Sequence, residues 1–377
     1  MSASQGTFAI RGWCPDAWRP MAAGDGLLMR VKPRLARLSR EQGLALAGLA
    51  RRFGNGLIDV TSRANLQLRG VQEAGWPELL DKLVALALVD AEPLREARRN
   101  VLVAPDWQVG DDTHRIALAL LDKLPEFPEL PGKMGFVIDA GAAPMLREEP
   151  GDFRIERGLD GALILRADGR EAGAPLAPGS EVEALPGLAQ WFVASGGAAS
   201  GRMARHHAAL PDWAAEAVAP AAGAALPDSG VHPLGTLVVL PFGQADAARF
   251  EALLDHPQAT GLRFLPGRRV LVEGVFDDAL ADPADAALLH VDACPGAPQC
   301  PQASVSTRDL ARALAPLVLG RLHVSGCAKG CARSAPADLV LTGREGLFDL
   351  AFHARAGAPP EQSGLTPADL LARFGAA

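Results

Sequence analysis

The chain has 377 residues, of which 49% are hydrophobic, and a formal net charge of −7. This length predicts two or three domains, and the hydrophobic content excludes general disorder. The acidic charge excludes a general nucleic-acid binder, which needs a basic face. The apolar runs are short and interrupted by charges, and the N-terminus lacks the apolar core of a secretory signal. We therefore expect a cytoplasmic protein without a membrane span.

The first predicted unit runs from Gly24 to Val71 and reads strand, helix, strand, strand. The stretch "GLLMRV" has strand composition. "SREQGLALAGLARRFG" predicts a helix with Ser39 as its N-cap and a glycine at its end. "GLIDVTSRANLQLRGV", which begins at Gly56, contains two β runs around a polar turn.

The same order returns near the middle of the chain. "GTLVVLPFG" predicts a strand, "QADAARFEALLDHP" a helix, and "GLRFLPGRRVLVEGV" two more strands. The last segment begins at Gly261 and shares with the Gly56 segment an opening Gly-Leu, a central arginine and a closing Gly-Val. Such a long spacing is typical of a duplicated domain. We therefore predict two related half-domains.

A strand–helix–strand unit is expected after each half-domain. In the second unit the cysteines lie at strand-to-loop junctions, and we expect Arg99, Asn100 and Lys133 at the matching places of the first unit. One half would then supply metal ligands and the other positive charge. A helix over Val182–Ala194 is expected between the halves. The predicted domains are a first half-domain at 11–75, a first α/β lobe at 76–200, a linker at 201–229, a second half-domain at 230–287 and a second lobe at 288–377.

Four of the five cysteines form two close pairs. Five residues separate Cys294 from Cys300, and three separate Cys327 from Cys331. Structural zinc sites favour shorter spacings than the first pair has. The spacing favours a [4Fe–4S] cluster, with a zinc site or inert buried thiols as alternatives. Cys14 is expected to be a lone thiol.

The residues that flank the cysteines support a stiff, closely packed site. Pro295, Pro298 and Pro301 restrict the first loop. Gly326 and Gly330 would let the second loop approach a bulky object closely.

"SGCAKGCARSAPADLVL" resembles the cluster signature of the nitrite and sulfite reductase family. "TSRANLQLRG", "RRNVL" and "LPGKMGF" resemble its anion-site stretches. The chain resembles one branch of this family, the precorrin-3B synthases, more closely than it resembles the reductases. This resemblance lies in "RGWCPDAWRPMAAGDGLLMRV", "VHPLGTLVVLPFGQ" and "HVSGCAKGCARSAPADLVLTGREGLFDL". The resemblance implies an α+β, nitrite/sulfite reductase-like fold. Such a fold has duplicated ferredoxin-like half-domains plus two α/β lobes with pseudo-two-fold symmetry.

The resemblance also implies a chemistry. Members of this branch are monooxygenases of cobalamin biosynthesis that convert precorrin-3A, O2 and reductant to precorrin-3B by meso-carbon hydroxylation and γ-lactone formation. Their cofactors are a [4Fe–4S] cluster, here on Cys294, Cys300, Cys327 and Cys331, and a mononuclear non-haem iron. The expected partners are a tetrapyrrole substrate, O2 and an electron-donating reductase or ferredoxin.

Three basic residues match the family's anion-site positions, and the resemblance implies that they bind substrate carboxylates: Arg63, Arg99 and Lys133. Further candidates for a basic groove are Arg69, Arg98, Arg268 and Arg269, because guanidinium groups pair with carboxylates. No ligands of the iron are assigned. The histidines considered for it are His206, His207, His232, His290 and His323, and structural roles are expected for each.

The lysine stretch departs from the family pattern, because Gly135 stands where the reductases carry a second lysine. Two alternative functions stay open. One is a siroheme-dependent sulfite or nitrite reductase, and the other is a zinc-stabilised binding module without redox activity.

Overall fold

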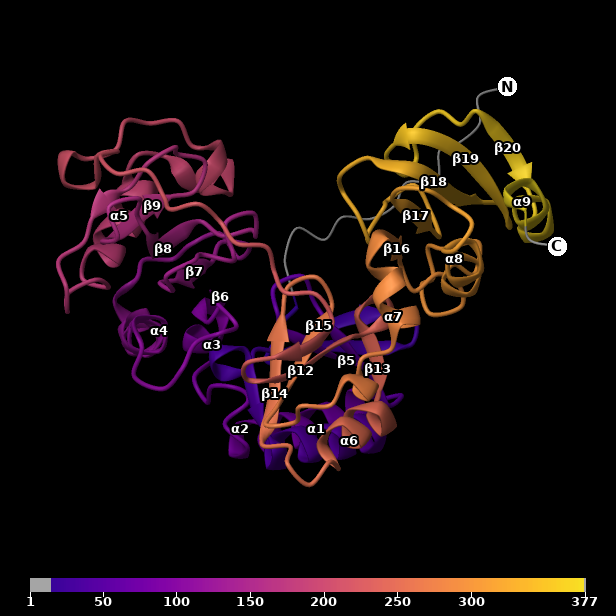
Figure 1. The fold of residues 1–377 in the computed structure, drawn as a ribbon, viewed down its shortest axis with the longest axis horizontal. Helices are drawn as coiled ribbons and strands as arrows, with labels where there is room; N and C mark the ends of the chain where they lie inside the picture. Colours follow the sequence, from indigo (N-terminus) through magenta and orange to yellow (C-terminus); the bar gives the residue numbers. More distant parts are fainter. Residues whose placement is uncertain (1–14, 376–377) are drawn as a thin grey trace.

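The computed structural model describes residues 15–375, so Cys14 lies outside the described part. Four five-stranded sheets and their covering helices form an α+β fold, as predicted. In Figure 1 two sheets lie at the centre, above α1 and α6, and one lobe rises on each side. In the described residues, no helix combines the length and apolar character that a membrane span requires.

The two central sheets exchange strands. The first sheet consists, in spatial order, of β1 (Met21–Ala23), β2 (Gly26–Val31), β5 (Leu66–Val71), β4 (Leu57–Val60) and β13 (Gln244–Asp246). The second consists of β11 (Gly230–His232), β12 (Gly235–Val239), β15 (Arg269–Glu273), β14 (Gly261–Leu265) and β3 (Arg37–Ser39). β13 pairs antiparallel with β4, and β3 pairs antiparallel with β14. Each half-domain therefore completes the sheet of the other.

The helices α1 (Arg40–Phe53) and α6 (Ala247–Leu254) follow the exchanged strands in the two copies. Ser39 caps α1 in a capping box with Gln42, and Asp246 caps α6. Gly43 lets the helices approach, because a Cβ there would lie 2.5 Å from Leu254 Cδ1. One hydrophobic core contains buried residues of both copies. The element order and the strand exchange confirm the predicted duplication.

The two lobes repeat one topology. The first-lobe sheet consists of β10 (Ala174–Pro175), β9 (Leu163–Ala167), β8 (Phe153–Arg157), β7 (Phe136–Asp139) and β6 (Val101–Val103). The second-lobe sheet consists of β16 (Val291–Ala293), β17 (Leu322–Ser325), β18 (Ala337–Arg344), β19 (Leu347–Ala354) and β20 (Gln362–Leu365). In each lobe the first three strands of the chain pair in parallel and the last two add antiparallel. This repetition confirms the pseudo-two-fold arrangement.

Helices complete the lobes and the connections. The first lobe contains α4 (Asp112–Lys123) and α5 (Ala184–Ala194), and the second contains α8 (Arg308–Leu314) and α9 (Pro367–Phe374). Between the units lie α2 (Trp76–Ala85), α3 (Pro93–Arg98) and α7 (Pro283–Ala287). The helix expected from Val182 begins at Ala184.

The segment expected as a linker begins as part of the first lobe. Met203 and Ala214 are buried in the first-lobe core, and Val218 bridges to Gly173. The domain boundaries given above stay predictions.

Replacing Phe250 tests the shared core. This side chain is fully buried and stacks on Phe264 with ring centroids 6.2 Å apart. Phe250→Ala should lower the free energy of unfolding by about 3–5 kcal/mol, because it leaves a cavity. Chemical denaturation measures the loss. Phe276→Ala is the control, since Phe276 is 58% exposed. Equal losses in the two variants would contradict the shared core.

Candidate functional site

The two cysteine loops begin at neighbouring strand ends. β16 and β17 pair in parallel, with Ala293 opposite Val324, and Cys294 and Cys327 follow their carboxyl ends. Because parallel strands end at the same edge of a sheet, the loops meet there. The Gly326 N–H donates to Cys294 Sγ at 3.2 Å. This bond joins the second loop to a cysteine of the first.

Two glycines allow the loops to pack closely. A Cβ at Gly326 would lie 2.6 Å from the Cβ of Ala303, which belongs to the first loop. Gly330 has a φ of +62°, a conformation that favours glycine. Gly326 thus packs against the other cysteine loop, and the predicted approach of Gly326 and Gly330 to a bulky group stays a prediction.

The four thiols share one neighbourhood. Burial raises the pKa of the Cys331 thiol. The charge of Lys329 opposes this shift, and the thiols of Cys294, Cys327 and Cys300 add to it. In residues 15–375 no group of three or more His, Cys, Asp or Glu side chains is placed to hold a single metal ion. A [4Fe–4S] cube holds its thiolates farther apart than one zinc ion does. A [4Fe–4S] cluster on these four cysteines stays a prediction.

Carboxylates lie near the corresponding strand ends of the first lobe. Asp106 follows β6, and Asp139 ends β7. The prediction that Arg99, Asn100 and Lys133 occupy the matching places was wrong, because these residues precede the two strands instead of following them. Burial raises the pKa of Asp139 to about 6, although the N–H groups of residues 145 and 146 donate to its carboxylate.

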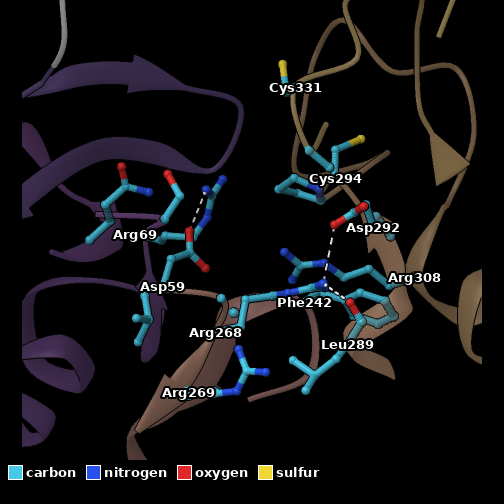
Figure 2. A pocket seen from close by; sticks show the side chains of 18 of the residues that line it. Asp59, Arg69, Phe242, Arg268, Arg269, Leu289, Asp292, Cys294, Arg308 and Cys331 are labelled. Carbon is cyan, nitrogen blue, oxygen red and sulfur yellow. Dashed lines mark hydrogen bonds and ion pairs between the residues drawn. The ribbon is translucent and has the colours of Figure 1, made fainter. Parts of the chain in front are cut away.

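A cavity of about 530 Å³ lies between the central sheets and the second lobe (Figure 2). The sulfur-bearing residues Cys294 and Cys331 line one side of it. Two aspartates, Asp59 and Asp292, also line it. Its five arginines are Arg69, Arg268, Arg269, Arg308 and Arg321. The cavity therefore concentrates positive charge beside the cysteines of an acidic chain.

Three of the five arginines lie within 3.3 Å of a carboxylate oxygen, in closer ion pairs than the other two form. Arg69 Nε lies 2.9 Å from Asp25 Oδ2, and its Nη1 lies 3.2 Å from Asp59 Oδ2. Asp292 accepts from Arg268 at 3.3 Å and from Arg321 at 3.0 Å. Figure 2 shows Asp292 and Arg268 joined in this way, below Cys294. These pairs fix the guanidinium groups in place.

The other two arginines are less well neutralised. The ion-pair partner of Arg269 is Asp228, which is 96% exposed and lies 3.8 Å away. Arg308 donates to the neutral amide oxygen of Gln244. Burial lowers the pKa of both guanidinium groups, so their charged forms are poorly solvated. An anion in the cavity would relieve this cost.

The sequence patterns predicted three of these five arginines as site residues and did not predict the other two. Arg69, Arg268 and Arg269 were candidates, and the structure places them together in the cavity. Arg308 is the first residue of α8, and Arg321 directly precedes β17. Nothing in the local sequence of either arginine indicated a site.

The predicted anion-site residues occupy two separate places. Arg63 donates to the backbone carbonyl of Lys133 at 2.9 Å, next to Ser62 in the cavity wall. Arg99 does not line the cavity. Its side chain is 10% exposed, and its guanidinium contacts Glu96 at 2.9 Å and donates to the Lys32 carbonyl at 2.7 Å. Binding roles for these residues stay predictions.

Apart from His206 and His207, which are consecutive residues, the candidate histidines belong to different segments. His206 shares a hydrogen bond of 2.7 Å with the Ser195 hydroxyl, and His290 Nε2 lies 3.3 Å from the Ala315 carbonyl. His232 lies in β11, and His323 is fully buried in β17. The described residues thus contain no ligand set for the mononuclear iron that the resemblance implies.

Comparison with known proteins places these features in context. The model of the "Nitrite/Sulfite reductase ferredoxin-like half domain" matches residues 19–86. The chain is 31% identical to a precorrin-3B synthase of Sinorhizobium sp, over 100% of the chain and 91% of that protein. It is also 31% identical to a ferredoxin–nitrite reductase of Synechococcus elongatus, over 37% of the chain and 30% of that protein. The structure of the Mycobacterium tuberculosis NirA protein superposes with a TM-score of 0.62 at 18% identity, covering 91% of this chain and 78% of that one.

The cysteine assignment predicts a metal content. Replacing Cys327 by serine should remove most of the iron and acid-labile sulfide from anaerobically purified protein, because a cluster ligand is lost. Cys14→Ser should keep both at the level of the unaltered protein. Elemental and sulfide analysis measures the difference. Full iron and sulfide in Cys327→Ser, or one zinc without sulfide in the unaltered protein, would refute the cluster.

Proposed function

The chain belongs to the precorrin-3B synthase family of nitrite/sulfite reductase-like proteins, and on this basis we propose that it is an oxygen-inserting enzyme that acts on a tetrapyrrole. The proposed reaction converts precorrin-3A to precorrin-3B. One atom of O2 enters the product at a meso carbon, with closure of a γ-lactone, and the other leaves as water. A reductant must therefore supply a pair of electrons.

The residue composition of the cavity wall is the main support for this proposal. Five arginines and two of the four paired cysteines line one cavity, whereas the chain as a whole is acidic. A tetrapyrrole edged with carboxylates matches such a wall, because guanidinium groups bind carboxylates through paired hydrogen bonds. Neither a neutral ligand nor a cation would offset the buried positive charge.

The cavity arginines would have two different roles in substrate binding. Arg269 and Arg308, which have no buried carboxylate partner among the described residues, would contact substrate carboxylates directly. Arg268 and Arg321 are held by Asp292, so they would set the shape and potential of the wall. The fixed positions of these side chains would orient the ring before reaction.

Cys294, Cys300, Cys327 and Cys331 would hold a [4Fe–4S] cluster. When bound, such a cluster supplies electrons one at a time. The Gly326 N–H beside Cys294 Sγ would stabilise negative charge on that sulfur and so favour the reduced state. We further propose a ferredoxin or a reductase as the electron donor.

Isotope labelling tests the proposed reaction. Under ¹⁸O2, with precorrin-3A and a reductant, the product should gain one labelled oxygen at the lactone-bearing edge. Mass spectrometry detects it. Label that comes only from water would overturn the proposal. Siroheme that co-purifies with viologen-linked sulfite or nitrite reduction would support the reductase alternative, which the nitrite reductase relative makes the second candidate.

The cavity arginines give a second test. Arg308→Gln should weaken the binding of precorrin-3A by about 1.5–3 kcal/mol, the worth of a charged hydrogen bond, with little change in melting temperature. Arg344→Gln is a matched control, because Arg344 has the same charge and a side chain that is 60% exposed. Fluorescence titration under anaerobic conditions measures affinity. Equal affinities in the two variants would remove Arg308 from the binding site.

A further inference from the structure

Two arginines from distant segments converge on one carbonyl oxygen. Arg63, in the turn between β4 and β5, donates through Nη1 to the carbonyl of Lys133 at 2.9 Å. Arg202, which follows α5, donates to the same oxygen through its own Nη1, also at 2.9 Å. The acceptor residue itself carries an exposed ammonium group. Three cationic side chains therefore belong to one small region.

A buried carboxylate fixes this arrangement. Asp152 is fully buried and lies 3.1 Å from Arg202 Nε. It also accepts from the Gly135 N–H at 3.0 Å and the Met203 N–H at 2.9 Å. Asp152 thus ties the segment that carries Arg202 to the loop that carries Lys133. Asp168 is a second carboxylate that attracts Arg202 electrostatically.

Packing explains why residue 135 itself contributes no cation. A Cβ at Gly135 would lie 2.6 Å from both Nδ2 and the backbone oxygen of Asn100. The Asn100 side chain is held in place because its Nδ2 donates to the Met134 carbonyl at 2.8 Å. No side chain fits at position 135 without displacing this strand edge. A second cation on this loop must come from another segment, and Arg202 provides it.

We propose that Arg63, Lys133 and Arg202 form one carboxylate-binding corner, in which Arg202 is a specificity-determining residue. This inference rests on the proposed function and adds a residue to its substrate site. Two guanidinium groups on one neutral oxygen repel each other, and an anion between them offsets that repulsion. Ser62, next to Arg63, lines the arginine-rich cavity. The corner would therefore bind an edge carboxylate of a ring whose other carboxylates meet Arg269 and Arg308.

Calorimetric titration with uroporphyrin III tests the corner. This stable tetrapyrrole carries only carboxylate side chains, and the unaltered full-length protein should bind it. Arg202→Gln should weaken binding by about 10- to 100-fold, because a charged hydrogen bond to a carboxylate is lost. Arg202→Lys should lose less, because it keeps the charge. Arg205→Gln, an exposed arginine three positions away, is the matched control and should bind like the unaltered protein.

Arg63→Gln is a second variant that leaves the ion pair between Arg202 and Asp152 intact. It should also weaken binding, and the double variant Arg63→Gln/Arg202→Gln should lose less than the product of the single losses, because both arginines serve one carboxylate. Binding by Arg202→Gln equal to that by Arg205→Gln, with unchanged melting temperatures, would overturn the corner and leave the proposed function standing. Failure of the unaltered protein to bind the tetrapyrrole would overturn the proposed function and the corner together.

Discussion

The exchange of β3 and β13 is the constraint on which the rest of the molecule depends. A short strand at a sheet edge finds its hydrogen-bonding partners on the other half-domain, so neither sheet is complete alone. The exchange brings α1 and α6 against each other and merges the two apolar faces into one core. With the halves fixed in this way, β4 and β5 of the first copy and β15 of the second border the same cavity, opposite the second lobe. Residues far apart in the sequence become neighbours through this one pairing.

The two lobes show how one topology carries different chemistry. Soft thiols follow strand ends in the second lobe, whereas the half-buried Asp106 and the buried Asp139 lie near the strand ends of the first. Soft sulfur ligands suit iron–sulfur clusters, whereas Asp139 is occupied by the N–H groups of its own loop. The cavity arginines do not all belong to one lobe. Positive charge collects where the central sheets meet the lobes, and there the buried guanidinium groups have too few carboxylates to balance them.

Local patterns predicted the parts of this structure that depend on local physics. The N-cap at Ser39, the glycine after α1 and the two β runs that form β4 and β5 are properties of short segments, and the structure confirms them. The cysteine loops were found because spacing and flanking glycines are also local. Arg308, Arg321 and Arg202 could not be found, because their importance comes from contacts with residues more than twenty positions away. The prediction that Arg99 and Lys133 correspond to the cysteines failed because both groups of residues flank equivalent strands. Only the strand topology shows that the basic residues precede their strands and the cysteines follow theirs.

The exchanged strands also bear on how such a chain could exist in two copies. A single half-domain with its lobe would expose the edge of β4, and a second identical molecule could cover that edge by the same reciprocal pairing. Such a homodimer would have two identical lobes, so any residue acquired for one would also stand in the other. Joining the two copies in one polypeptide removes this symmetry requirement. The thiols could then be confined to one lobe while the other kept carboxylates, which makes asymmetry of the site a direct benefit of fusion.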